Sequence, residues 1–91
     1  MLKRFVIERD VPGIGSNDEK GFCQIAKTSN TALRQLATKV QWEHSYVAGN
    51  KTFCVYLAED EAAIRDHARL SGFPANIITP VLAVIDPVTE R

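Results

Sequence analysis

Hydrophobic and polar positions alternate along the chain in two different periods, which predict strands and helices in turn. Residues 3–9 alternate with period two, so that Phe5 and Ile7 share one face of an expected strand. One proline and two glycines follow within residues 11–15, and they interrupt any strand ladder. We therefore expect a first strand that ends near residue 9.

Two longer segments repeat their hydrophobic residues at the helical period. In the first, Ser16 is followed three residues later by Glu19, which is the pattern of a capping box. The inner stripe of this amphipathic helix is formed by Phe22, Ile25, Ala26, Ser29, Leu33, Leu36 and Ala37. In the second, Asp60 is the expected N-cap and Gly72 the expected left-handed residue after the helix. Its inner stripe is formed by Ala63, Ile64, His67 and Ala68.

The remaining β-rich runs predict a hairpin and a last strand. Residues 40–47 and 52–58 flank a Gly-Asn dipeptide, and residues 80–86 follow the second helix. The resulting β-α-β-β-α-β order is that of the ferredoxin-like fold, and right-handed crossovers place both helices on one face of the antiparallel sheet. We therefore predict the α+β class, with one ferredoxin-like sandwich domain over residues 1–91. The other sheet face is left for water, a ligand or a partner subunit.

Composition narrows the classes of function. Eleven Lys and Arg residues balance eleven Asp and Glu residues, whereas nucleic-acid-binding proteins usually carry a basic excess. The N-terminus is charged within its first eight residues, and no apolar run approaches the ~20 residues of a membrane span. We therefore expect no nucleic-acid partner, no membrane association and a cytoplasmic location, where Cys23 and Cys54 would be reduced thiols.

The register of the hairpin decides which of its reactive side chains can meet. With Gly49-Asn50 as a two-residue loop, Ser45 lies opposite Cys54. One face then carries Glu43, Ser45, Cys54 and Tyr56. The other face carries Trp42, His44 and Tyr46 together with Phe53, Val55 and Leu57, and these apolar residues would face the helices. A three-residue loop or a bulge would instead place His44 and Tyr46 beside Cys54 and Tyr56. The turn sequence favours the first register.

Two candidate sites follow from the first register. One is a patch on the open sheet face, formed by Glu8, Glu43, Cys54 and Tyr56. The other is a pocket between the sheet and the helices, where His44 and Tyr46 point toward the helix that carries His67. Imidazole, thiolate and carboxylate groups together suit nickel, zinc or cobalt. The alternative for Cys54 and His67 is a structural role as buried residues of the core.

Several segments of the chain resemble the DUF4242 family. They are residues 42–47 (WEHSYV), 51–58 (KTFCVYLA), 61–68 (EAAIRDHA) and 72–75 (GFPA), with 5–9 (FVIER) and 84–87 (VIDP). The resemblance implies a dimeric ferredoxin-like fold. For part of the family it also implies nickel binding for sequestration rather than catalysis, near the dimer surface. Carried over to the donor atoms of this chain, it makes Glu8, His44, Cys54 and His67 the candidate metal ligands.

Three functions are compatible with these features. The first, which we adopt as the prediction, is a non-catalytic homodimeric protein that binds Ni²⁺, or Zn²⁺ or Co²⁺, for sequestration or homeostasis, without an organic cofactor. The second is a small dimeric α/β-barrel enzyme, similar to isomerases or monooxygenases, that binds an unidentified small molecule. Its pocket would lie between the sheet and the helices, with His44, Tyr46 and His67 as polar groups. Further possible pocket residues are Trp42 and Tyr56. The third is an interaction module in which the hairpin serves as a dimer interface.

Overall fold

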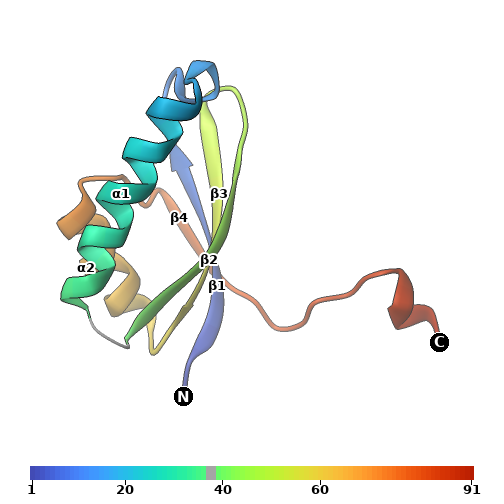
Figure 1. Cartoon of the computed structure of the whole chain (residues 1–91). Helices are drawn as coiled ribbons and strands as arrows, with labels where there is room; N and C mark the ends of the chain where they lie inside the picture. Colours follow the sequence, from blue (N-terminus) through green and yellow to red (C-terminus); the bar gives the residue numbers. More distant parts are fainter. Residues whose placement is uncertain (37–38) are drawn as a thin grey trace.

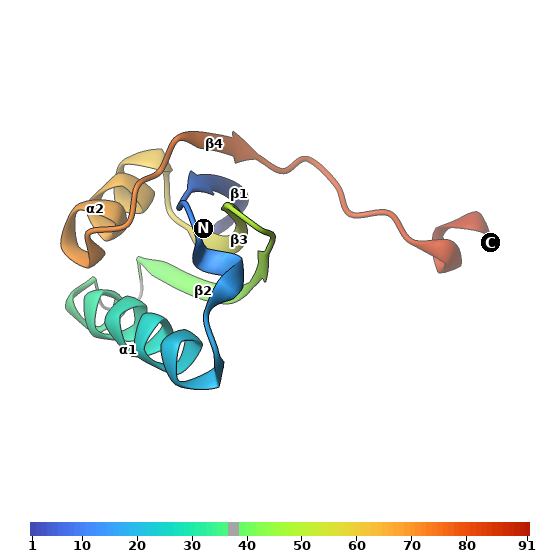
Figure 2. The same ribbon diagram turned by 90° about the horizontal axis from the view of Figure 1, so that it is seen from above.

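A four-stranded antiparallel sheet carries two helices on one of its faces (Figures 1 and 2). The computed structural model describes residues 1–36 and 39–91. The sheet order is β2-β3-β1-β4, with bounds β1 Lys3–Asp10, β2 Val40–Val47, β3 Lys51–Ala58 and β4 Ile77–Pro80. The helices are α1 Glu19–Gln35 and α2 Glu61–Ser71, and the short 3-10 helices are η1 Ile14–Ser16 and η2 Pro87–Glu90. The predicted ferredoxin-like α+β fold is confirmed.

The core lies between the sheet and the two helices. Phe5 and Ile7 on β1 pair with Tyr56 and Cys54 on β3, and all four side chains are buried. Helix α2 covers this surface with Ala63, Ile64 and His67, also buried. Along α1, only Ser29 and Ala32 are buried. The sheet is therefore covered more completely beneath α2 than beneath α1.

Helix α1 begins later than the predicted capping box. Asp18 is the N-cap, and its side chain accepts a hydrogen bond from the Gly21 amide at 2.9 Å. The prediction that Ser16 caps this helix is wrong, because Gly13 adopts a φ of 78° and the chain winds into η1. Ser16 ends η1 and donates its hydroxyl to the Gly13 carbonyl. The predicted stripe residue Ala37 lies outside the described residues.

Helix α2 has the predicted ends. The Asp60 side chain accepts from the Ala63 amide at 2.9 Å. Gly72 follows the helix with a φ of 80°, a conformation that an L side chain rarely adopts. Both end signals of this helix are confirmed.

The predicted two-residue hairpin loop is confirmed, because the Ala48 amide donates to the Lys51 carbonyl and Ser45 pairs with Cys54. A bulge between Trp42 and His44 then brings Trp42 opposite Tyr56. The prediction that Phe53, Val55 and Leu57 face the helices is wrong. The pairing of β3 with β1 places Cys54 and Tyr56 on the same face as the core positions of β1.

The last strand lies earlier in the chain than predicted. β4 covers Ile77–Pro80 instead of residues 80–86, and it pairs with β1 from Glu8 to Phe5. The Val81 amide still donates to the Arg4 carbonyl, but β1 begins only one residue earlier, at Lys3. Within the described chain, residues 82–86 therefore have no partner strand. A β-prone sequence without a partner strand cannot form a ladder.

Residues 82–91 form an extended arm that leaves the body on the side away from the helices (Figures 1 and 2). Its apolar side chains are exposed: Leu82, Val84, Ile85 and Val88. The arm ends in η2, which Asp86 caps by accepting from the Val88 and Thr89 amides. Neither helix of the described chain has the length and apolar character needed to cross a bilayer.

Candidate functional site

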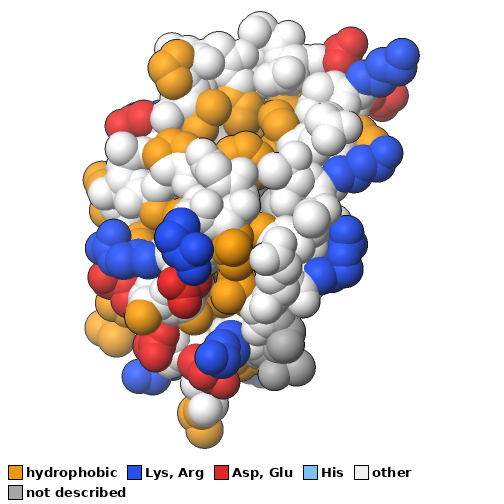
Figure 3. All heavy atoms as spheres, turned by 90° about the vertical axis from the view of Figure 1, so that its left-hand side faces the viewer, with side chains coloured by type: hydrophobic (Ala, Val, Ile, Leu, Met, Phe, Trp, Pro, Cys, Tyr) orange, Lys and Arg blue, Asp and Glu red, His pale blue; other side chains and the backbone are white. Residues whose placement is uncertain are grey.

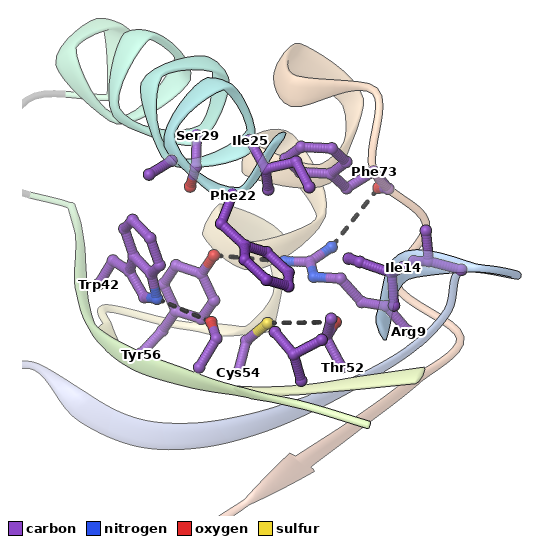
Figure 4. Close-up of a pocket in the computed structure, with 14 residues that line it drawn as sticks. Arg9, Ile14, Phe22, Ile25, Ser29, Trp42, Thr52, Cys54, Tyr56 and Phe73 are labelled. Carbon is purple, nitrogen blue, oxygen red and sulfur yellow. Dashed lines mark hydrogen bonds between the residues drawn. The ribbon is translucent and has the colours of Figure 1, made fainter. Parts of the chain in front are cut away.

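A cavity of about 270 Å³ lies between the sheet and the N-terminal half of α1 (Figure 4). Its walls are mostly apolar, because α1 contributes Phe22 and Ile25 and the segment after α2 contributes Phe73. Trp42 closes the side formed by β2, and Ile14 closes the side formed by η1. The cavity therefore occupies the part of the interlayer that the partly exposed α1 stripe leaves unfilled.

Arg9 is the charged residue of this cavity, and it is only 3% exposed. Its Nη1 donates to the Pro74 carbonyl at 2.6 Å and approaches the Phe73 carbonyl at 3.5 Å. Its Nη2 lies 3.5 Å from the Tyr56 hydroxyl, and its guanidinium carbon lies 5.8 Å from the centre of the Tyr56 ring. Among residues 1–36 and 39–91, no carboxylate forms an ion pair with Arg9.

Two short hydrogen-bonded pairs form the floor of the cavity on β2 and β3. The Trp42 indole nitrogen donates to the Ser45 hydroxyl at 2.9 Å. The Cys54 thiol lies 3.5 Å from the Thr52 hydroxyl. The bulge makes the first pair possible, because it turns Trp42 to the side of the sheet that carries Ser45 and Tyr56.

His67 lies behind the cavity, fully buried between α2, α1 and the sheet. Its Nε2 lies 3.2 Å from the Ser29 hydroxyl, its ring centre lies 5.1 Å from that of Tyr56, and its Nδ1 has no hydrogen-bond partner in the described chain. Burial, and secondarily the charge of Arg9, lowers the pKa of His67 to about 4. Burial also raises the pKa of Tyr56, against the opposing effect of Arg9. Both side chains are therefore neutral near pH 7.

The opposite, open face of the sheet carries a separate set of polar groups. Arg4 forms an ion pair with Glu43 at 2.8 Å, and this hydrogen bond lowers the pKa of the Glu43 carboxyl. Lys51 lies 3.9 Å from Glu8. His44 is exposed, 5.1 Å from Tyr46 between ring centres. These groups are reached from solvent, whereas those of the cavity are enclosed.

A family model described as nickel responsive protein SCO4226-like matches residues 5–81. The chain belongs to this family. The crystal structure of SCO4226 from Streptomyces coelicolor A3(2) superimposes with a TM-score of 0.71 and 19% sequence identity, over 90% of this chain and 99% of that one. At this identity the likeness establishes the fold. No curated protein matches the chain.

The four predicted metal ligands of this family member lie on two sides of the sheet. Glu8 and His44 are on the open face, whereas Cys54 and His67 are buried in the interlayer. Within the described chain, no group of three or more His, Cys, Asp or Glu side chains could hold a metal ion. The described donor atoms of a single chain, taken alone, therefore do not fit a nickel ion.

The predicted grouping of side chains on the hairpin needs correction. Cys54 and Tyr56 are absent from the open-face patch because they point toward the helices. Conversely, His44 and Tyr46 do not line the pocket; Tyr46 is 63% exposed on the opposite face. A pocket between the sheet and the helices is present, and Trp42 and Tyr56 are in its lining.

Arg9 is the candidate site residue that sequence reasoning missed. The sequence contains a signal for its burial, because the alternation that places Phe5 and Ile7 in the core continues to Arg9. A charged side chain on the apolar face of a strand indicates either a buried partner or a site.

Both cysteines, Cys23 and Cys54, are free thiols, as expected.

Proposed function

We propose that the protein is a non-catalytic nickel-binding protein, acting in nickel sequestration or homeostasis as a homodimer. The observation that carries the proposal is the match of residues 5–81 to the nickel-responsive family. The earlier resemblance to DUF4242 supports the same assignment. The structural similarity to SCO4226 supports the fold that the proposal assumes.

Two chains contribute the ligands in this proposal, because the described residues of one chain do not gather three donors. His44 is the principal ligand. It is exposed, and imidazole is a donor that suits nickel. The Glu8 carboxylate lies on the same face, and its contact with Lys51 is long at 3.9 Å. His67 and Cys54 are excluded because they are buried on the helix side.

The open sheet face supports a second copy as the partner. Its central strands present Val6, Phe53, Val55 and Leu57, which are only partly buried in one chain. The exposed apolar arm, residues 82–91, leaves the body on the side away from the helices. In the proposed dimer, the arm of each chain covers apolar surface of its partner. Removing both surfaces from water favours association.

Calorimetric titration of the full chain with Ni²⁺ at neutral pH tests the proposal. We expect saturable uptake with no more than one ion for each chain, weakening as the pH falls because protons compete with the metal for its ligands. His44→Ala should lose at least about tenfold in affinity. The matched control is His67→Gln, which should bind like the wild type. An absence of uptake by the wild type, or unchanged uptake by His44→Ala, would overturn the proposal.

A further inference from the structure

Arg9 is a buried cation whose hydrogen-bonding capacity is only partly used. Nη1 is held by the turn carbonyls of Phe73 and Pro74, while Nη2 has, among residues 1–36 and 39–91, only the Tyr56 hydroxyl at 3.5 Å. A contact of that length is a weak hydrogen bond. A buried guanidinium without an opposite charge is costly, and a carboxylate would match its fork of donors. We propose that the cavity beside α1 binds a small carboxylate with an apolar body, anchored by Arg9.

The apolar walls define the rest of the ligand. Phe22, Ile25 and Trp42 surround the space into which the Arg9 side chain projects (Figure 4). A cavity of 150 Å³ is enough for benzene, so about 270 Å³ admits roughly ten non-hydrogen atoms. One guanidinium among apolar walls suits a single negative charge. A doubly charged phosphate would lose more hydration than this site returns.

The Tyr56 hydroxyl supplies a second donor at the charged end of the cavity. It lies beside Arg9 Nη2, and burial raises its pKa, so the group keeps its proton near neutral pH. A carboxylate oxygen placed beside the two groups, on the cavity side, would accept from both. Figure 4 shows the Tyr56 hydroxyl and the guanidinium pointing toward each other below α1.

The apolar lining is also continuous with the surface between the helices. Figure 3, which views the helix-covered side, shows hydrophobic side chains running between α1 and α2. Phe22, on the first turns of α1, is 36% exposed although it lines the cavity. An apolar ligand body would cover this side chain from solvent.

Trp42 is the single tryptophan of the chain and lines the cavity, so its fluorescence reports occupancy directly. The probes are benzoate, its neutral isostere benzamide, and acetate, which has the charge without the ring. With a chelator present, nickel plays no part, and the result is independent of the nickel proposal. We expect a saturable response to benzoate with a dissociation constant of about 1 mM or below. Benzamide and acetate should bind at least about tenfold more weakly.

Two variants separate ligand anchoring from a purely structural role of Arg9. Arg9→Gln should weaken benzoate binding at least about tenfold, while Arg4→Gln, on the open face, should not change it. Because Arg9 also ties the turn after α2, Ala26→Phe serves as a second variant that fills the cavity and leaves Arg9 in place. It should abolish the response. Equal binding of benzamide and benzoate, no saturable response of the wild type, or an unchanged response of Ala26→Phe would each overturn the proposal.

Discussion

At the scale of single residues, the interlayer is governed by two buried polar side chains, Arg9 and His67. Arg9 is held by the turn after α2, whose carbonyl oxygens accept its hydrogen bonds. His67 is neutral because burial disfavours its cationic form and Arg9 adds a like charge nearby. A histidine with a lowered pKa makes the free energy of unfolding depend on pH.

Between about pH 6.5 and pH 4, the unfolded chain takes up a proton on His67 that the folded chain does not. The contribution of His67 to the free energy of unfolding is therefore complete above the pKa of its imidazole in the unfolded chain, and it is lost as the pH falls toward the folded pKa of about 4. We expect this residue to lower the free energy of unfolding by up to about 3 kcal/mol across that interval. Urea unfolding at several pH values measures it.

His67→Gln keeps a group able to bond with Ser29 but removes the titration, so its unfolding should depend less on pH over that interval. His44→Gln is the matched control. It replaces the exposed histidine and leaves His67 in place, so the loss of stability caused by His67 should remain. If His67→Gln shows the same slope as the wild type, the buried histidine does not account for the pH dependence.

At the scale of elements, the ends of helices and the hairpin decide the positions of the site residues. The bulge between Trp42 and His44 turns the indole toward the cavity while His44 stays on the open face. η1 closes one side of the cavity with Ile14, because Gly13 allows the chain to turn before α1. The α2 cap holds the helix that buries His67.

Asp60→Ala tests the contribution of the α2 cap. Loss of the bond to the Ala63 amide should lower the free energy of unfolding by about 1 kcal/mol. Asp66→Ala, on the exposed face of the same helix, should change it by less than about 0.5 kcal/mol. Thermal or urea unfolding of both variants provides the comparison. Equal effects of the two substitutions would contradict a specific capping role.

At the scale of the whole molecule, the two sides of the sheet carry different side chains. The helix side encloses a cavity with a cation, and the open side carries exposed apolar and polar groups together with the departing arm (Figure 1). The proposed nickel ligand His44 and the proposed carboxylate anchor Arg9 therefore act on opposite sides. The two proposals can be tested separately in the same chain.

The arm provides the test of the homodimer. A chain ending at Val81 lacks the exposed Leu82, Val84 and Ile85, and its dimer should dissociate at least about tenfold more readily than that of the full chain. A chain ending at Asp86 keeps these side chains and serves as the control. Sedimentation analysis over a range of concentrations measures the change. A full chain that is monomeric throughout, or a dimer unaffected by ending the chain at Val81, would contradict the proposed interface.

The local pattern of the sequence was sufficient for the type and order of the elements. The period-two run of β1, the Asp60 and Gly72 ends of α2 and the Gly49-Asn50 loop all depend on residues close together in the chain. Such signals act through local backbone geometry and alternation, which are the same in any surrounding. The position of the last strand was different, because it depended on where its partner β1, distant in sequence, ends.

Only the tertiary structure decided which side chains form the site. Both faces of β3 carry apolar residues, Phe53 and Val55 on one and Cys54 and Tyr56 on the other, so alternation alone leaves the buried face undetermined. The long-range pairing of β3 with β1 buries the face that carries Cys54 and Tyr56. The same pairing encloses Arg9 beside Tyr56. The sequence determined that β3 has two faces; the pairing with β1 determined which one meets the helices.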